Sequence, residues 1–314
     1  MQPYKEKELK EILLRTELKN VDLSSRVMNQ LYAEQHKKER VNMRYRYKVG
    51  VMVITGMLLT ASSGFAAVHY QSLSNKNGDV TYQVKPATEF PAFQEEEIQR
   101  LDFSRELGDE LLQEGTAAIF YVIPHNPGGV TDTRSKPVTY SDWSTLQSKL
   151  SGQSVKIAEQ LADGYSFHSA SVRYMPVNLV NPPDPVEAAA TADKLRKQAE
   201  QSGKDYAMLP VELSDQLNNL TAAYRQGGKE VTVHIARTKG PVTAYMDEQV
   251  DFTAEKLVFQ GVEMVYTKYK GGNSLAWSAE IPGRQEHILY EMHEMSGQYF
   301  SKEEMLRMAA PFLK

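Results

Sequence analysis

The stretch EVTVHIAR, residues 230–237, decides the fold class that we predict for this chain. Val231, Val233 and Ile235 alternate with polar or small residues, and this period of two is typical of a half-buried β-strand. The pair Gly227–Gly228 precedes the stretch and predicts a hairpin turn. The pattern therefore indicates a strand with one apolar face and one face that carries polar side chains.

Similar short strands, separated by Gly and Pro, lie on both sides of this stretch. We expect them at 80–84, 116–123, 165–174, 220–225, 257–260, 262–268, 274–280 and 287–295. Helices are expected at 93–113, 143–150, 155–161, 188–201 with Pro185 in its first turn, and from Ser301 onward, whereas 178–185 holds three prolines and is expected to be irregular. This order of elements predicts an α+β domain, with a mostly antiparallel sheet covered by helices on one face.

The stretch VGVMVITGMLLTASSGFAAV, residues 49–68, carries no charged residue. As a helix it would span about 30 Å, the thickness of a bilayer's hydrocarbon core. A basic cluster precedes it, made of Lys37, Lys38, Arg40, Arg44, Arg46 and Lys48. Because basic flanks stay on the cytoplasmic side, residues 1–48 are expected inside and residues 69–314 outside.

Two alternatives to a retained transmembrane helix follow from the seven Gly, Ser and Thr residues that dilute this stretch. One is a signal peptide cleaved near Gly64–Ala66, and the other is a buried core helix. The long region before the stretch favours a retained anchor, because whole signal peptides usually have about 15 to 30 residues.

Charge divides the chain at the same place. Residues 1–48 hold 12 of the 36 Lys and Arg residues and 7 of the 40 Asp and Glu residues, so their net charge is +5 and that of the remainder is −9. Such asymmetry is a signal of localisation. An acidic external part also argues against nucleic acid as its ligand.

The predicted organisation has four parts: a cytoplasmic helical tail at 1–48, a transmembrane helix at 49–68, a linker with the first strand at 69–90, and an extracytoplasmic α+β domain at 91–314. The chain has no Cys. This excludes disulfides, a thiolate zinc site, a catalytic Cys and an acylated lipoprotein Cys. The external domain must therefore be stabilised by a packed core, and it has enough residues to bury one.

Two short amphipathic helices are predicted in the tail, the first from about Lys5 to Leu18 and the second after Asp22 as its N-cap. Isolated helices of this length are marginal in water, so their apolar stripes need a partner. Two alternatives follow. Either the two helices pack on each other or lie on the membrane surface, or their apolar stripes bind a soluble cytoplasmic protein. The predicted partner-binding residues are Leu9, Ile12, Leu13, Leu23, Val27, Met28 and Leu31.

Several stretches resemble a pattern found in single-pass membrane proteins of Gram-positive bacteria. They are LLQEGTAAIFYV at 111–122, KPVTYSDW at 136–143, LADGYSFHSASV at 161–172, and the run 274–312 with SLAW and SKEEMLRMAAPF. The tail segment VDLSSRVMNQL at 21–31 is similar to the cytoplasmic helix of the same proteins.

These proteins look like anti-sigma factors, or negative effectors of extracytoplasmic-function sigma factors, with an uncharacterised external domain. The resemblance implies a sigma factor as the cytoplasmic partner. It supplies no catalytic residue. This chain departs from the zinc-binding anti-sigma pattern because it has no Cys, and its tail is short for a complete sigma-binding domain.

The sequence lacks three motifs of common enzymes: the G-x-S-x-G elbow, the Walker A loop and the S-x-x-K motif. One set of polar residues could take part in catalysis or ion binding. His287, Glu291 and His293 share one face if their stretch is a strand. Glu291 and His293 would lie about 6.7 Å apart and could share an ion, whereas His287 would lie about 20 Å from His293. Gly297 stands where the second histidine of an H-E-x-x-H helix would be.

Two ligands do not make a structural zinc site, so we expect a solvated strand face here and predict no metal or cofactor. Trp277 alternates with Leu275 and is expected in the core. The predicted function is that of a membrane-anchored, non-enzymatic regulator with a cytoplasmic protein partner, a sigma factor, and an unknown external ligand. An envelope binding or assembly protein without a sigma-factor partner, and a hydrolase with dispersed catalytic groups, are the alternatives.

Overall fold

The computed structural model describes residues 54–55, 71–91, 94–246, 252–269, 271–294 and 300–313. All of them belong to the unit Val51–Lys314, which is described here by itself. Within these ranges, no helix combines the length and the apolar character that a membrane crossing requires. The tail predicted at 1–48 and most of the segment 49–68 lie outside the described residues.

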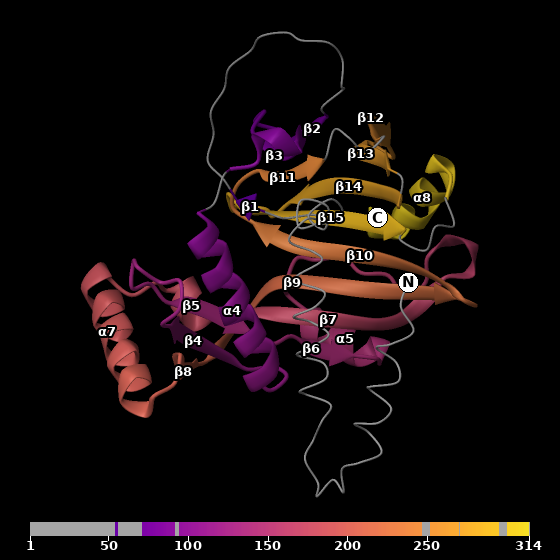
Figure 1. The fold of residues 1–314 in the computed structure, drawn as a ribbon. Coiled ribbons are helices and arrows are strands. Elements are labelled where there is room, and N and C mark those ends of the chain that lie inside the picture. The colour runs from indigo at the N-terminus through magenta and orange to yellow at the C-terminus, as the bar shows by residue number, and fades with distance from the viewer. Residues whose placement is uncertain are drawn as a thin grey trace, which may run out of the picture. The chain divides into compact units, whose positions relative to one another are not determined.

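An eight-stranded antiparallel sheet, the large sheet, runs across the domain (Figure 1). EVTVHIAR lies in one of its central strands, and the turn at Gly227–Gly228 joins it to the preceding strand, as predicted. In spatial order the strands are β12 (Phe252–Phe259), β13 (Val262–Tyr269), β14 (Gly272–Glu280), β15 (His287–Glu294), β10 (Lys229–Thr238), β9 (Leu213–Gln226), β7 (Ser166–Pro176) and β6 (Val138–Tyr140).

One face of the large sheet carries the main hydrophobic core. Val231, Val233 and Ile235 are all buried there, as the alternation in the sequence predicts. The core is closed by α5 (Trp143–Leu150), α8 (Lys302–Ala309) and the short 3-10 helix η4 (Ala310–Phe312). Ser301 caps α8 in a capping box with Glu304, which satisfies backbone groups at the helix start.

A small sheet covers part of the opposite face. Its strands, in spatial order, are β1 (Ile54–Thr55), β11 (Val242–Met246), β3 (Val80–Pro86) and β2 (Ser72–Ser74). Leu73, Tyr82 and Val84 pack with Val265 and Leu289 of the large sheet in a second core. The pair β3 and β11 is parallel, whereas every other strand pair among the described residues is antiparallel.

A three-stranded sheet lies between two helices, α4 (Glu95–Leu111) and α7 (Pro185–Ser202) (Figure 1). Its order is β5 (Asp132–Ser135), β4 (Ala117–Val122) and β8 (Tyr206–Val211). β4 buries residues on both faces, Phe120 against α4 and Tyr121 against α7. This is why its sequence is a continuous apolar run. β8 passes through Glu212 directly into β9 and so connects this sheet to the large sheet.

The predicted α+β class with mostly antiparallel strands is confirmed, but the expected single sheet is three sheets. The helix predicted at 155–161 is wrong. Backbone donors there bond to distant groups, such as Lys156 N to the Tyr290 hydroxyl at 2.9 Å, and Ser154 adopts a positive φ of 58°. Tertiary contacts hold this loop outside helical geometry, although Ala158 and Leu161 are buried.

Several further segments differ from expectation or were not anticipated, among them the strands β5, β6, β8 and β11. The irregular stretch predicted at 178–185 begins with one helical turn, α6 (Val177–Val180), because the conformational restriction before proline acts only from Asn181 onward. The polar linker expected at 71–79 contains β2, anchored by the buried Leu73. Two further 3-10 turns, η2 (Ala87–Glu89) and η3 (Ala162–Gly164), complete the described elements.

Ile54–Thr55 lies within the segment 49–68 that we predict to cross the membrane. These two residues pair with Thr243 and Val242 of β11. The rest of the segment lies outside the described residues, so the transmembrane helix stays a prediction.

Candidate functional site

His287, Glu291 and His293 share one face of β15, as the sequence predicts, because Tyr290 and Met292 face the main core. The solvated environment expected for them is wrong: the exposed fractions of His287 and Glu291 are 6% and 2%. His293 is half-buried. Two of the three polar side chains on this face are therefore buried, which is uncommon and draws attention to function.

Pairing between β10 and β15 adds a further histidine to this face. His234 lies directly opposite Glu291, and its Nδ1 is 3.0 Å from the hydroxyl oxygen of Thr221 on β9. We call Glu291, His293, His234 and Thr221 the polar cluster. The alternation in EVTVHIAR placed His234 on the polar face, but the register that sets it beside Glu291 depends on tertiary pairing and has no signal in the sequence.

Burial shifts the pKa values of the ionisable members of the polar cluster. It raises the pKa of Glu291 to about 7 and lowers that of His293 to about 4, with His234 as a second cause for His293. The pKa of His234 is lowered by burial and then by Arg173. Near neutral pH both histidines are therefore uncharged, and Glu291 is close to its midpoint.

Tyr82 brings the small sheet close to this cluster. Burial raises the pKa of Tyr82 well above its ordinary value, and the carboxylate of Glu291 is the second cause. His287 has a separate, structural role. Its Nε2 lies 2.7 Å from the Thr238 hydroxyl and 3.3 Å from the carbonyl oxygen of Thr81, so it ties the large sheet to β3.

The geometry limits what the polar cluster can do chemically. In the described part of the chain, no three His, Asp or Glu side chains come together as metal ligands. Ser274 lies opposite His293 in the strand register, but no hydrogen bond joins them, so they do not form an activated nucleophile. The cluster is best described as a partly buried polar group in which Glu291 changes its charge close to physiological pH.

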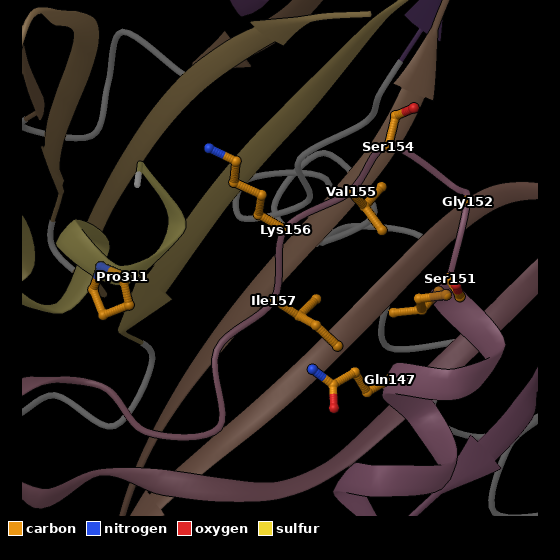
Figure 2. A pocket seen from close by; sticks show the side chains of 9 residues that line it. Gln147, Ser151, Gly152, Ser154, Val155, Lys156, Ile157 and Pro311 are labelled. Atoms are coloured by element: carbon orange, nitrogen blue, oxygen red, sulfur yellow. The ribbon is translucent and has the colours of Figure 1, made fainter.

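A hollow of about 620 Å³ lies elsewhere, beside the loop that follows α5. Figure 2 shows Pro311 on one side of it and Gln147 on the other, with the loop residues between them. Lys156 is its single ionisable lining residue. The hollow is lined by Gln147, Leu150, Ser151, Gly152, Ser154, Val155, Lys156, Ile157 and Pro311, none of which the sequence marked as a functional residue.

The predicted partner-binding residues are not among those described. Leu9, Ile12, Leu13, Leu23, Val27, Met28 and Leu31 all lie outside the described ranges. The prediction for the tail therefore stands on its sequence pattern alone.

The chain was compared with protein-family models, curated proteins and solved structures, and none of them matches it.

Glu291 is expected to make the domain less stable as the pH rises. Its pKa is about 7 in the folded protein against an ordinary value of 4.5, so its stabilising contribution is complete below pH 4.5 and is lost as the pH rises through 7. The difference corresponds to about 3 kcal/mol. Glu291→Gln mimics the protonated side chain, so at pH 8 it should raise the free energy of unfolding by up to that amount, with little change at pH 4.5.

His293 has the opposite sign and supplies the control. Its pKa of about 4 lies below the ordinary 6.5, so its contribution is present above pH 6.5 and is lost as the pH falls through 4. His293→Gln should therefore change the free energy of unfolding only at acid pH. Urea unfolding of the full chain in detergent, followed by fluorescence of Trp143 and Trp277, measures both effects. Parallel pH profiles for Glu291→Gln and the unmodified protein would show that Glu291 titrates normally.

Proposed function

We propose that this chain is a membrane-anchored regulatory protein, similar to anti-sigma factors. Its N-terminal helices bind a cytoplasmic partner, a sigma factor, and its α+β domain lies outside the membrane. The observation that supports this most is the uncharged stretch 49–68, which stands between the basic cluster at 37–48 and the hydrophobic cores built from residues after position 70.

The described domain is consistent with this division. Its sheets and helices form several hydrophobic cores from residues after position 70. The tail has a net positive charge and the remainder a net negative charge. A domain that folds from its own residues fits the sensing part of a protein whose tail does a separate task on the other side of a membrane.

Partner binding would use the apolar stripe of the second tail helix, Leu23, Val27, Met28 and Leu31. Each fully buried side chain of this size contributes about 1.5 to 3 kcal/mol before the cost of ordering is subtracted. A sigma factor held in this way is kept from its own target. The sigma factor is released when a change outside the membrane weakens its binding to the tail helix.

The external domain has a binding role in this proposal. In this proposal, a partly buried polar cluster in which Glu291 titrates near neutral pH, and in which the described residues form no activated nucleophile, is suited to sensing more than to catalysis.

Capture of the partner tests the proposal. The full chain, tagged at its C-terminus, is cross-linked in cells, solubilised in detergent and purified, and the bound proteins are identified. We expect a sigma factor of the extracytoplasmic-function class. Recovery of envelope proteins alone would contradict the regulatory role and favour the envelope-assembly alternative.

A further inference from the structure

Arg173 is a half-buried cation without a counter-charge. It lies on β7 and on the polar face of the large sheet, because its neighbour Val172 points into the main core. Its Nε is enclosed and has no hydrogen-bond partner, and no described residue forms an ion pair with its guanidinium. A guanidinium carries five donors and stays charged, so enclosing its Nε without an acceptor is unfavourable.

Two further arginines lie on the neighbouring elements. Arg100 of α4 pairs with Asp132 of β5, and their side chains are 9% and 10% exposed. Arg134 is held by neutral acceptors, with its Nε 3.0 Å from the Ser104 hydroxyl and its Nη2 2.9 Å from a backbone carbonyl. Among the described residues, Asp132 is thus the single carboxylate paired with these three arginines, and two positive charges stay uncompensated.

Gly108 permits this arrangement. A Cβ added at Gly108 would lie 3.1 Å from the Cβ of Arg134, so the missing side chain lets α4 approach β5 closely. The approach places the fully buried Ser104 against the guanidinium of Arg134.

The elements that carry these arginines are in contact. β5 packs against β7, and Asn178 of α6 donates from its Nδ2 to the Thr133 hydroxyl at 2.8 Å. Burial lowers the pKa of Arg134, and Arg173 is among the cations that lower it further. The Oδ1 of Asn178 is buried without a partner, so a second polar atom at this junction is also unsatisfied.

We propose that Arg173, together with Arg134 and Arg100, binds an oxyanion, the carboxylate or phosphate group of a small molecule. The planar fork of donors on a guanidinium matches both groups, and the two uncompensated charges favour a ligand with one or two negative charges. The site belongs to the described domain and does not depend on where residues 1–48 lie. The competing explanation is that Arg173 only supports the fold.

Thermal unfolding of the full chain in detergent tests this site, with inorganic phosphate, acetate and chloride titrated at matched ionic strength. Phosphate also stabilises proteins non-specifically, so the decisive quantity is a saturable rise in Tm that depends on Arg173. We expect a rise of several degrees with phosphate or acetate and none with chloride. A response to both oxyanions identifies a general site, and a response to one of them identifies its preferred group.

Arg173→Met should abolish the saturable rise and, without anion, should leave Tm unchanged or higher, because an unpaired charge has been removed. Arg173→Lys keeps the charge but loses the planar fork of donors. This variant should fold, and the phosphate concentration that gives half of the rise in Tm should increase about tenfold. Arg196→Met on the exposed part of α7 is the matched control and should keep the response. Equal responses in the protein and in both Arg173 variants, or no response to either oxyanion, would overturn the site.

Discussion

Replacing both Val27 and Leu31 with Asp is expected to abolish capture of the cytoplasmic partner and to leave membrane insertion unchanged. The two positions are four residues apart and lie on the same stripe of the predicted second helix. The change removes two apolar contacts and places two carboxylates against an apolar groove, which costs several kcal/mol. A loss of this size lowers affinity more than a hundredfold. Quantitative pull-down of the partner with the full chain measures it.

The control uses the opposite side of the same helix. Ser25→Asp with Asn29→Asp adds the same charge at the same spacing, but about half a turn away from the stripe. This variant should capture the partner normally. Undiminished pull-down by the Val27 and Leu31 variant, or equal losses in both variants, would remove helix docking as the mechanism.

Trp277→Ala is expected to destabilise the α+β domain by about 3 to 5 kcal/mol, the usual range for truncating a buried aromatic residue. Trp277 is 1% exposed. Its ring stacks on Tyr290 at 5.1 Å between centroids and lies 5.9 Å from Phe312 of η4. The change therefore removes packing between the large sheet and the C-terminal helix. Urea unfolding followed by circular dichroism gives the free energy of unfolding.

Trp143→Ala is the comparison for this result. Trp143 is only partly buried at the start of α5, where it meets the edge of Phe167 at 5.4 Å. Its truncation should destabilise the domain clearly less. Losses of similar size at both positions would mean that the aromatic stack around Trp277 does not dominate the core.

The sequence predicts the strands of this domain well where their period is regular. EVTVHIAR and the stretch around His287 each show a clear alternation, and both are central strands with the expected faces. Trp277 also lies in the core as predicted, and the last helix begins directly after Ser301, where a helix was expected. In these cases a local pattern and the tertiary structure favour the same conformation.

Predictions fail where tertiary contacts determine the local backbone conformation. Val155 and Ile157 have an apolar pattern that fits a helix, but bonds from the loop backbone to β15 hold an extended path. Short strands such as β2 contain too few residues for a period to be recognised. The division into three sheets follows from strand pairing over long distances, which no single segment encodes.

The candidate site was predictable only in part. Alternation placed Glu291 and His293 on a common face, but the burial of Glu291 depends on the small sheet and on contacts far along the chain. Arg173 and Arg134 lie 39 residues apart and come together only because β5 packs against β7. Charge at these positions is visible in the sequence, whereas the missing counter-charge is a property of the fold.

A membrane crossing and the pairing of Ile54–Thr55 with β11 are mutually exclusive for these two residues. A helix within a bilayer satisfies its backbone internally and has no group free to join a sheet. A membrane crossing requires the residues before and after 49–68 to lie on opposite sides of the membrane. Their location therefore decides between the crossing and the strand pairing.

Cysteine labelling in intact cells is the most direct measurement, because the chain has no Cys of its own. Val186→Cys introduces one thiol at a position that is 78% exposed in the α+β domain, and Ser24→Cys introduces one in the tail. With a membrane-impermeant maleimide, we expect Val186→Cys to be labelled in intact cells and Ser24→Cys only after lysis. Labelling of Ser24→Cys in intact cells, or protection of Val186→Cys until lysis, would contradict the proposed topology.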